Sequence, residues 1–134
     1  MRVLVTGASG FVGRHLVNFL KEKPAVEVFG PVKGGMARPD VTDAQAFHQW
    51  LSDIKPDRVF HLAAQSSVPQ SWAFPDETYR TNVLGTLNLF EGLRKIGKKV
   101  RVHIASSSEV YGKVDAAHIP TLEDCPVKPL TPYG

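Results

Sequence analysis

The sequence predicts an α/β fold in which a parallel sheet carries helices on both faces. Three observations support this prediction. Short apolar runs alternate with longer segments of helical periodicity, prolines and glycines separate the two kinds of segment, and a glycine-rich turn directly follows the first apolar run. Strands that alternate with helices along a chain pair in parallel, because each helix returns the chain to the same end of the sheet. Right-handed crossovers then distribute the helices over both faces.

Four short runs rich in β-branched and other apolar residues are expected to be the strands of this sheet. Gly7 ends the first run, and Gly30 with Pro31 ends the second. Glycine and proline at such points favour turns over continued strands. The four runs cover residues 2–6, 26–29, 58–62 and 100–105.

Three segments show the apolar spacing of helices, and we expect helices over residues 11–23, 42–54 and 75–96. Thr42 and Gln45 fit a capping box at the start of the second helix. Gly97 fits the C-terminal cap of the third. Residues 63–71 and those from 106 onward are expected to be loops. The third helix has an apolar stripe made of Tyr79, Val83, Leu87, Phe90 and Leu93.

The composition is that of a globular protein. The chain has 134 residues, of which 43% are hydrophobic and 22% charged, and this excludes a disordered chain, a collagen-like repeat and a coiled coil. No apolar run is long enough to span a membrane. Gly7 follows Met1 too closely for a secretory signal, so a cytoplasmic location is expected.

Metal and nucleic-acid binding find little support in the sequence. Cys125 is the only cysteine, which excludes an internal disulfide, and the five histidines lack metal-ligand spacing. The formal net charge is +3, and the basic residues are scattered apart from one cluster at 94–101. We interpret that cluster as a solvated helix end, with a nucleic-acid-binding patch as the alternative.

The glycine turn at residues 7–13 has the spacing G-x-x-G-x-x-G. Gly7 permits a tight turn, Gly10 removes a side chain where the backbone meets a pyrophosphate, and Gly13 lets the helix pack closely on the strand. The free N–H groups and the dipole of the helix then hold the phosphates of a dinucleotide. Ser9, Phe11 and Val12 belong to the same predicted cofactor site. The alternative is a purely structural turn.

The residues after the second predicted strand favour NADP(H) as the cofactor, with NAD(H) possible. An NAD site normally has an acidic residue about 20 positions after the glycines, bonded to the ribose 2′-OH. Lys33 is found in this region instead, and a cation suits a 2′-phosphate better, unless Lys33 is only a solvated loop residue. Asp40 and Val41 are well placed for the adenine amino group. Alternatively, Asp40 only marks the entry to the next helix.

Six motifs follow one another along the chain, at residues 7–13, 40–41, 61–66, 82–86, 106–112 and 132–134. Together they resemble the extended short-chain dehydrogenases, also called the NAD-dependent epimerase/dehydratase family. The resemblance implies a Rossmann-type doubly wound parallel sheet with helices on both faces. Residues 1–134 would be only the N-terminal portion of it, an incomplete NAD(P)-binding domain without the sugar-nucleotide-binding domain.

The same resemblance implies a hydride-transfer site based on a tyrosine. Tyr133 would be the acid/base on a sugar oxygen, and Ser107 would hydrogen-bond the same oxygen. Glu109 would remove a C5 proton in a dehydratase, unless it is only a structural carboxylate of the loop. The activating lysine of the family would lie beyond Gly134. Leu62, Ala63, Ala64 and Gln65 would approach the cofactor, and Ser67, Val68 and Ser108 the substrate.

Within the family, residues 52–57, 60–68 and 71–72 resemble the GDP-4-keto-6-deoxymannose reductases. This implies hydride transfer at C4 of the hexose of a GDP-sugar. The alternatives are a GDP-mannose 4,6-dehydratase, a nucleotide-sugar 4-epimerase, a non-catalytic NAD(P)-binding sensor and an inactive cofactor-binding fragment. The implied partners are a nucleotide-diphosphate sugar and, in a homodimer, a second copy of the protein.

Overall fold

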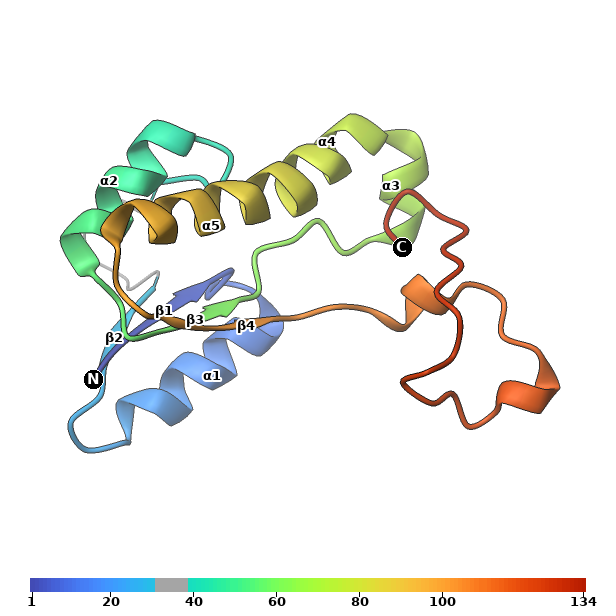
Figure 1. The fold of residues 1–134 in the computed structure, drawn as a ribbon, viewed down its shortest axis with the longest axis horizontal. Helices are drawn as coiled ribbons and strands as arrows, with labels where there is room; N and C mark the ends of the chain where they lie inside the picture. The colour runs from blue at the N-terminus through green and yellow to red at the C-terminus, as the bar shows by residue number, and fades with distance from the viewer. Residues whose placement is uncertain (31–38) are drawn as a thin grey trace.

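The computed structural model describes residues 1–30 and 39–134. Within these residues, four strands form one parallel sheet in the order β2-β1-β3-β4 (Figure 1). The chain therefore moves outward from β1 to β2, returns across β1 to β3, and continues to β4. The predicted parallel sheet is confirmed. The strands are β1 Arg2–Thr6, β2 Glu27–Phe29, β3 Arg58–His61 and β4 Arg101–Ile104.

Helices cover both faces of the sheet, as Figure 1 shows with α1 on one side and α2 and α5 on the other. Crossovers of one hand produce this arrangement when the chain reverses its direction across the sheet. In chain order, the helical elements are α1 Phe11–Lys21, α2 Ala44–Ile54, α3 Val68–Ala73, α4 Pro75–Tyr79, the π-helical turn η1 Arg80–Leu84, α5 Gly85–Ile96, and the 3-10 turns η2 Ser108–Tyr111 and η3 Ala116–His118.

Strand β1 contributes to two separate cores. Val3 and Val5 pack with Val17 of α1, whereas Leu4 packs with Leu51 of α2 and Leu89 of α5. All three β1 side chains are fully buried. Because successive side chains of a strand point to opposite faces, one apolar run supplies both cores.

Helix α2 begins later than the predicted capping box requires. Its N-cap is Asp43, whose carboxylate accepts the N–H of Ala46 at 3.0 Å. The N–H and hydroxyl groups of Thr42 donate instead to Oδ1 of Asp40, at 2.8 and 2.9 Å. The prediction that Thr42 and Gln45 cap this helix is therefore wrong, because the two aspartates already satisfy these donors.

The predicted loop over residues 63–71 contains the start of a short helix. In α3, Ser67 is the N-cap, and its hydroxyl accepts the N–H of Gln70. Pro69 stands in the first turn, where its missing N–H costs nothing. Ser71 is buried, and its hydroxyl donates to the carbonyl of Val68 at 2.7 Å. Polar residues at 67 and 71 therefore stabilise this helix instead of marking a loop.

The predicted helix over 75–96 is present, but it contains the π-helical turn η1 and its apolar stripe faces outward. Leu93 is buried, whereas Tyr79, Val83, Leu87 and Phe90 are between 47 and 56% exposed. Helix α5 instead buries a face made of two glycines and two leucines, Gly85, Leu89, Gly92 and Leu93. A Cβ atom on Gly92 would lie 2.6 Å from Cδ1 of Leu51, so α2 approaches α5 where a side chain is missing.

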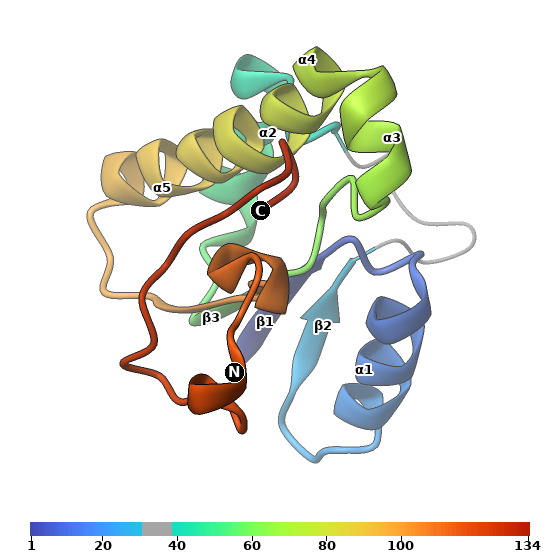
Figure 2. The same cartoon turned by 90° about the vertical axis from the view of Figure 1, so that its right-hand side faces the viewer.

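After Ile104 the chain is irregular apart from the turns η2 and η3, as predicted. Figure 2 shows this segment in front of the sheet, near the carboxyl ends of the strands. It returns on itself where the N–H of Lys128 donates to the carbonyl of Val110 at 2.9 Å. No helix in the described ranges is long and apolar enough to cross a membrane.

Candidate cofactor and catalytic site

The glycine turn, the end of β3 and residues 39–41 surround one cavity of about 580 Å³. The cavity lies where β1 and β3 end, beside the point at which the chain reverses its direction across the sheet. In open α/β sheets, ligands bind at this position. The predicted residues that line the cavity are Gly7, Ser9, Gly10, Phe11, Val12, Gly13, Asp40, Val41, Leu62, Ala63, Ala64 and Tyr133.

The glycine turn is held tightly against the end of β3. Gly7 has a φ of +64°, and a Cβ atom there would lie 2.6 Å from the carbonyl of Leu62 and from the nitrogen of Ala63. A Cβ on Gly13 would collide with the carbonyl oxygen of Gly7. Gly10 caps α1 without a side chain. The turn is therefore a cradle of bare backbone at a helix N-terminus, which fits the pyrophosphate of a dinucleotide.

A buried histidine connects the ends of β1 and β3. Nδ1 of His61 lies 2.8 Å from Oγ1 of Thr6, and Nε2 lies 3.2 Å from Oγ1 of Thr86. The Thr86 hydroxyl donates to the carbonyl of Asn82 at 2.6 Å, so it accepts from His61 Nε2–H. His61 is thus the neutral Nε2–H tautomer. Burial lowers the pKa of its imidazole below the usual value.

The loop after β3 is fastened to the long helix through Gln65 and Asn82. The N–H of Gln65 donates to Oδ1 of Asn82 at 2.8 Å, and Nδ2 of Asn82 donates to the Gln65 carbonyl at 3.0 Å. Nε2 of Gln65 donates to Oγ1 of Thr78 and to the carbonyl of Ser67. Gln65, predicted to bind the cofactor, thus braces the loop that carries Ala63 and Ala64 and does not itself line the cavity.

The segment at 39–41 forms the opposite wall of the cavity. Nδ2 of Asn88 donates to the carbonyl of Val41 at 2.9 Å. A Cβ on Gly85 would lie 2.7 Å from Cγ2 of Val41, so the segment packs closely on α5 where Gly85 has no side chain. Asp40 lies ahead of α2 and is not its cap, since Asp43 takes that role. Lys33, predicted to bind a 2′-phosphate, lies outside the described residues.

Ser107 and Tyr133 line a second cavity, of about 190 Å³. Tyr133 also lines the larger cavity, so the two cavities adjoin at this residue and at the end of β3. Oγ of Ser107 accepts the N–H of Glu109 at 3.2 Å. Since that bond uses only a lone pair, the Ser107 hydroxyl hydrogen remains available to a ligand. The fold thus brings together two residues that are 26 positions apart in the sequence.

Four other predicted residues line neither of these two cavities. Ser108 and Glu109 lie in η2, and the backbone of Glu109 packs against Gly134. Ser67 and Val68 lie at the start of α3. The predicted substrate and dehydratase residues therefore lie outside the linings of both cavities.

Sequence reasoning missed several residues that line the two cavities. His61, Asn82 and Thr86 border the smaller one, and Trp50 and Thr81 border the larger one. The position of His61 at the end of a strand was a usable signal, because the carboxyl ends of neighbouring parallel strands meet at one edge. Asn82 belongs to the motif at residues 82–86, which resembles the family, whereas Thr81 had no signal, because it reaches the site from a helix and lies outside the six motifs.

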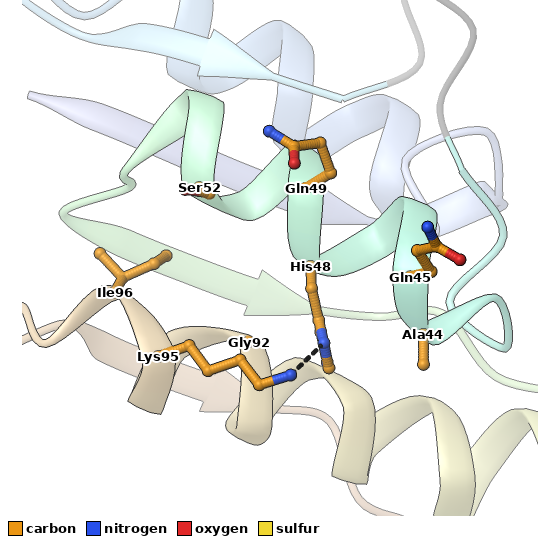
Figure 3. Close-up of a pocket in the computed structure, with 8 residues that line it drawn as sticks. All are labelled: Ala44, Gln45, His48, Gln49, Ser52, Gly92, Lys95 and Ile96. Carbon is orange, nitrogen blue, oxygen red and sulfur yellow. Dashed lines mark hydrogen bonds between the residues drawn. The ribbon is translucent and has the colours of Figure 1, made fainter.

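A third hollow, of about 500 Å³, lies between α2 and α5 and contains none of the predicted site residues (Figure 3). Nζ of Lys95 donates to Nδ1 of His48 at 3.1 Å across this hollow. The other ring nitrogen, Nε2, donates to the carbonyl of Asn88 at 2.9 Å. Within the described ranges, no group of three or more histidine, cysteine, aspartate or glutamate side chains is arranged to hold a metal ion.

Comparison with known proteins identifies relatives along the whole chain. The sequence model of the NAD dependent epimerase/dehydratase family matches residues 3–134. The chain is 38% identical to the UDP-glucose 4-epimerase of Mycolicibacterium smegmatis, over 100% of this chain and 47% of that protein. It is 36% identical to the GDP-6-deoxy-D-mannose reductase of Pseudomonas aeruginosa, over 99% of this chain and 42% of that protein.

A solved structure, that of RMD from Pseudomonas aeruginosa complexed with NADPH, superposes with a TM-score of 0.83. The two chains are 37% identical, and the superposition covers 98% of this chain and 44% of that one. The chain thus spans less than half the length of the relatives that it matches. Because the family match runs from Val3 to Gly134, this chain belongs to the NAD-dependent epimerase/dehydratase family.

Proposed function

We propose that the protein is an NAD(P)-dependent enzyme that transfers a hydride at a hexose carbon of a nucleotide sugar. The observation that supports this most directly is the position of Tyr133. This residue lines both the cavity that contains the glycine turn and the cavity that contains Ser107. A substrate oxygen beside Tyr133 would therefore lie next to the end of a dinucleotide held by the turn. Because this chain spans less than half of its relatives, the activity is proposed for the whole protein.

The residues of the larger cavity fit a nicotinamide dinucleotide. When bound, the dinucleotide supplies or accepts the hydride. The backbone N–H groups at the start of α1 hold its pyrophosphate, and the glycines of the turn keep that approach open. Asp40 and Val41 bind the adenine, and Leu62, Ala63 and Ala64 face the ribose. We further propose a preference for NADP(H), through Lys33.

Tyr133 and Ser107 handle the proton that accompanies the hydride. Hydride gain at a ketone carbon requires an acid on its oxygen, and the phenol of Tyr133 donates that proton. The hydroxyl hydrogen of Ser107 bonds the same oxygen, because Ser107 accepts rather than donates in its bond with Glu109. In the reverse direction, Tyr133 accepts the proton.

For the substrate, we propose a GDP-sugar and a reductase reaction at a 4-keto-6-deoxyhexose. Support comes from the resemblance of residues 52–57, 60–68 and 71–72 to that branch of the family, and from the 36% identity to a GDP-6-deoxy-D-mannose reductase. The position of Glu109 in η2, outside both cavities, favours a reductase over a dehydratase, which would need that carboxylate at the substrate.

The test is an assay of the whole protein with GDP-4-keto-6-deoxymannose, GDP-mannose and UDP-glucose, each with NADPH and with NADH. The reductase proposal expects oxidation of NADPH with the keto sugar alone. Dehydration of GDP-mannose or epimerisation of UDP-glucose, without keto-sugar reduction, would contradict it. Tyr133→Phe is expected to lower kcat by about 100-fold or more. Tyr111→Phe is the matched control, since Tyr111 lines neither cavity.

We also propose that the whole protein is a homodimer that pairs through the exposed apolar stripe of α4, η1 and α5. Tyr79, Val83, Leu87 and Phe90 recur at helical spacing, and each is about half exposed. A contiguous apolar patch of this kind marks an association surface. A second copy of the same helix is the occupant that matches the stripe in both length and character.

A further inference from the structure

We propose that Asn88 of α5 is a positioning residue for the adenine end of the cofactor, and that it acts through the carbonyl group of Val41. This inference rests on the proposed function, which assigns Asp40 and Val41 to the adenine. Asn88 itself does not line the cavity. It fixes the position of Val41, which lines the cavity.

The bond between Asn88 and Val41 connects two parts of the chain that are 47 positions apart. Nδ2 of Asn88 donates to the Val41 carbonyl at 2.9 Å in a partly buried environment. Pro39, Asp40 and Val41 all line the cavity. The Asp40 carboxylate accepts bonds from Thr42 within the local turn, whereas the bond of the Val41 carbonyl is long-range and ties this wall of the cavity to α5.

Gly85 provides the space that the bond requires. It stands three residues before Asn88, on the same face of the helix. A Cβ atom there would lie 2.7 Å from Cγ2 and 3.3 Å from Cβ of Val41. A larger residue would push the segment away from α5 and lengthen the bond to Asn88. Gly85 and Asn88 together therefore form the part of α5 that contacts Val41.

Asn88 is itself fixed by the neighbouring helix. Its backbone carbonyl accepts Nε2–H of His48 at 2.9 Å. Lys95 donates to the other ring nitrogen of His48, which leaves the hydrogen on Nε2 (Figure 3). Asn88 thus bonds both to the segment before α2 and to α2 itself. Val41 is thus connected through Asn88 to both α5 and α2.

This arrangement affects recognition of the adenine more than the chemistry at Tyr133. A carboxylate accepts hydrogen bonds, so Asp40 can bond a 6-amino group but not a 6-oxo group. That discrimination requires the segment to stand at the correct distance from the purine. Loss of the Asn88 amide allows the segment to shift, and the discrimination between the two purines then falls.

The experiment compares two dinucleotides on the whole protein: NADP⁺ and its hypoxanthine counterpart, in which an oxygen replaces the 6-amino group. Their dissociation constants are measured for the wild type, for Asn88→Ala and for the control Asn18→Ala, an exposed asparagine on α1. The wild type is expected to bind the adenine form more tightly. In Asn88→Ala the ratio of the two constants is expected to fall about fivefold, the worth of one hydrogen bond. In Asn18→Ala it is expected to be unchanged, and kcat at saturating cofactor stays near the wild-type value in both variants.

A general loosening of the fold would weaken both dinucleotides equally and leave the ratio intact, so the ratio separates positioning from stability. An unchanged ratio in Asn88→Ala, with a wild type that discriminates, overturns the role of Asn88 alone. A wild type that binds both purines equally overturns the adenine assignment and this inference with it. If Asn88→Ala does not fold, Asn88→Asp replaces it, since its carboxylate keeps the volume but lacks the donor, and the same fall is expected.

Discussion

The hydroxyl group of Thr6 donates a hydrogen bond to Nδ1 of His61 over 2.8 Å, and this bond joins the ends of two neighbouring strands. The same Thr6 oxygen accepts the N–H groups of Leu62 and Ala63, each at 3.2 Å. The Thr6 side chain therefore fixes both the orientation of the His61 ring and the position of the backbone that faces the glycine turn. These bonds require a neutral His61. In a protonated ring Nδ1 would also carry a hydrogen, and the Thr6 oxygen could not accept it because its two lone pairs already accept the N–H groups of Leu62 and Ala63.

Acidification is expected to destabilise the protein through His61. Burial lowers the folded pKa of this imidazole, so between the ordinary histidine value and the lower folded value only the unfolded chain binds the proton. Stability from this source is complete above about pH 6.5 and falls as the pH drops toward the folded pKa, by at most about 1.4 kcal/mol per pH unit. Urea denaturation at a series of pH values between 8 and about 5 measures the slope.

In His61→Gln this part of the pH dependence is expected to disappear, although the variant is less stable than the wild type at pH 8. His15→Gln serves as the control, because His15 is exposed on α1 and its replacement leaves the slope intact. Equal slopes in His61→Gln and the wild type would show that His61 does not carry the effect.

Replacement of Gly7 by alanine is expected to disrupt the cofactor cavity. The new Cβ would lie 2.6 Å from the Leu62–Ala63 peptide, and the φ of +64° adds backbone strain. Gly97→Ala is a matched control, since its φ is +67° but no atom lies within 4 Å of the new Cβ. We expect a loss of about 1 kcal/mol for Gly97→Ala and several times more for Gly7→Ala. Thermal denaturation compares the two, and equal losses would mean that the close approach to β3 is unimportant.

Removal of the Asn82 side chain is expected to loosen the loop after β3. Asn82 makes both hydrogen bonds to the backbone of Gln65, so Asn82→Ala leaves a partly buried N–H and C=O without their partners. Hydrogen exchange of the Gln65 amide is expected to accelerate by about tenfold, which corresponds to about 1.4 kcal/mol of local protection. Asn18→Ala should leave this amide unchanged. Unaltered exchange in Asn82→Ala would mean that other contacts hold the loop.

A charge in the apolar stripe is expected to separate the proposed dimer. Leu87 is 52% exposed in the single chain and would be covered in the dimer. Leu87→Glu would bury an unpaired carboxylate, and the dimer dissociation constant is expected to rise by more than about tenfold. Sedimentation velocity over a range of concentrations provides the measurement. Leu122→Glu, at an exposed leucine outside the stripe, is the control, and a wild-type protein that is monomeric throughout would refute the dimer.

The elements that were predictable are those that depend on neighbours in the sequence. Strand β1 ends where it was expected, because Gly7 directly follows a run of β-branched and apolar residues. Helix α5 ends at Gly97, which has the positive φ of a C-terminal cap. The predictions failed where neighbouring polar residues could each cap a helix or form a turn. Asp43 rather than Thr42 caps α2, and Ser67 caps a helix where polar residues suggested a loop.

The sequence by itself determined the alternation of strands and helices, the glycine turn and the set of residue types available at the site, because these depend on spacing and backbone preference along the chain. Only the tertiary structure decided which faces are buried and which distant residues meet. Helix α5 packs on α2 and the sheet through the face that contains Leu89 and Gly92, and Leu87 and Phe90 are exposed despite their apolar periodicity. Packing between elements also produces the bond between Asn88 and Val41 and brings Ser107 and Tyr133 to one cavity. Such contacts leave no periodic pattern in the sequence of a single segment, so the sequence alone could not predict them.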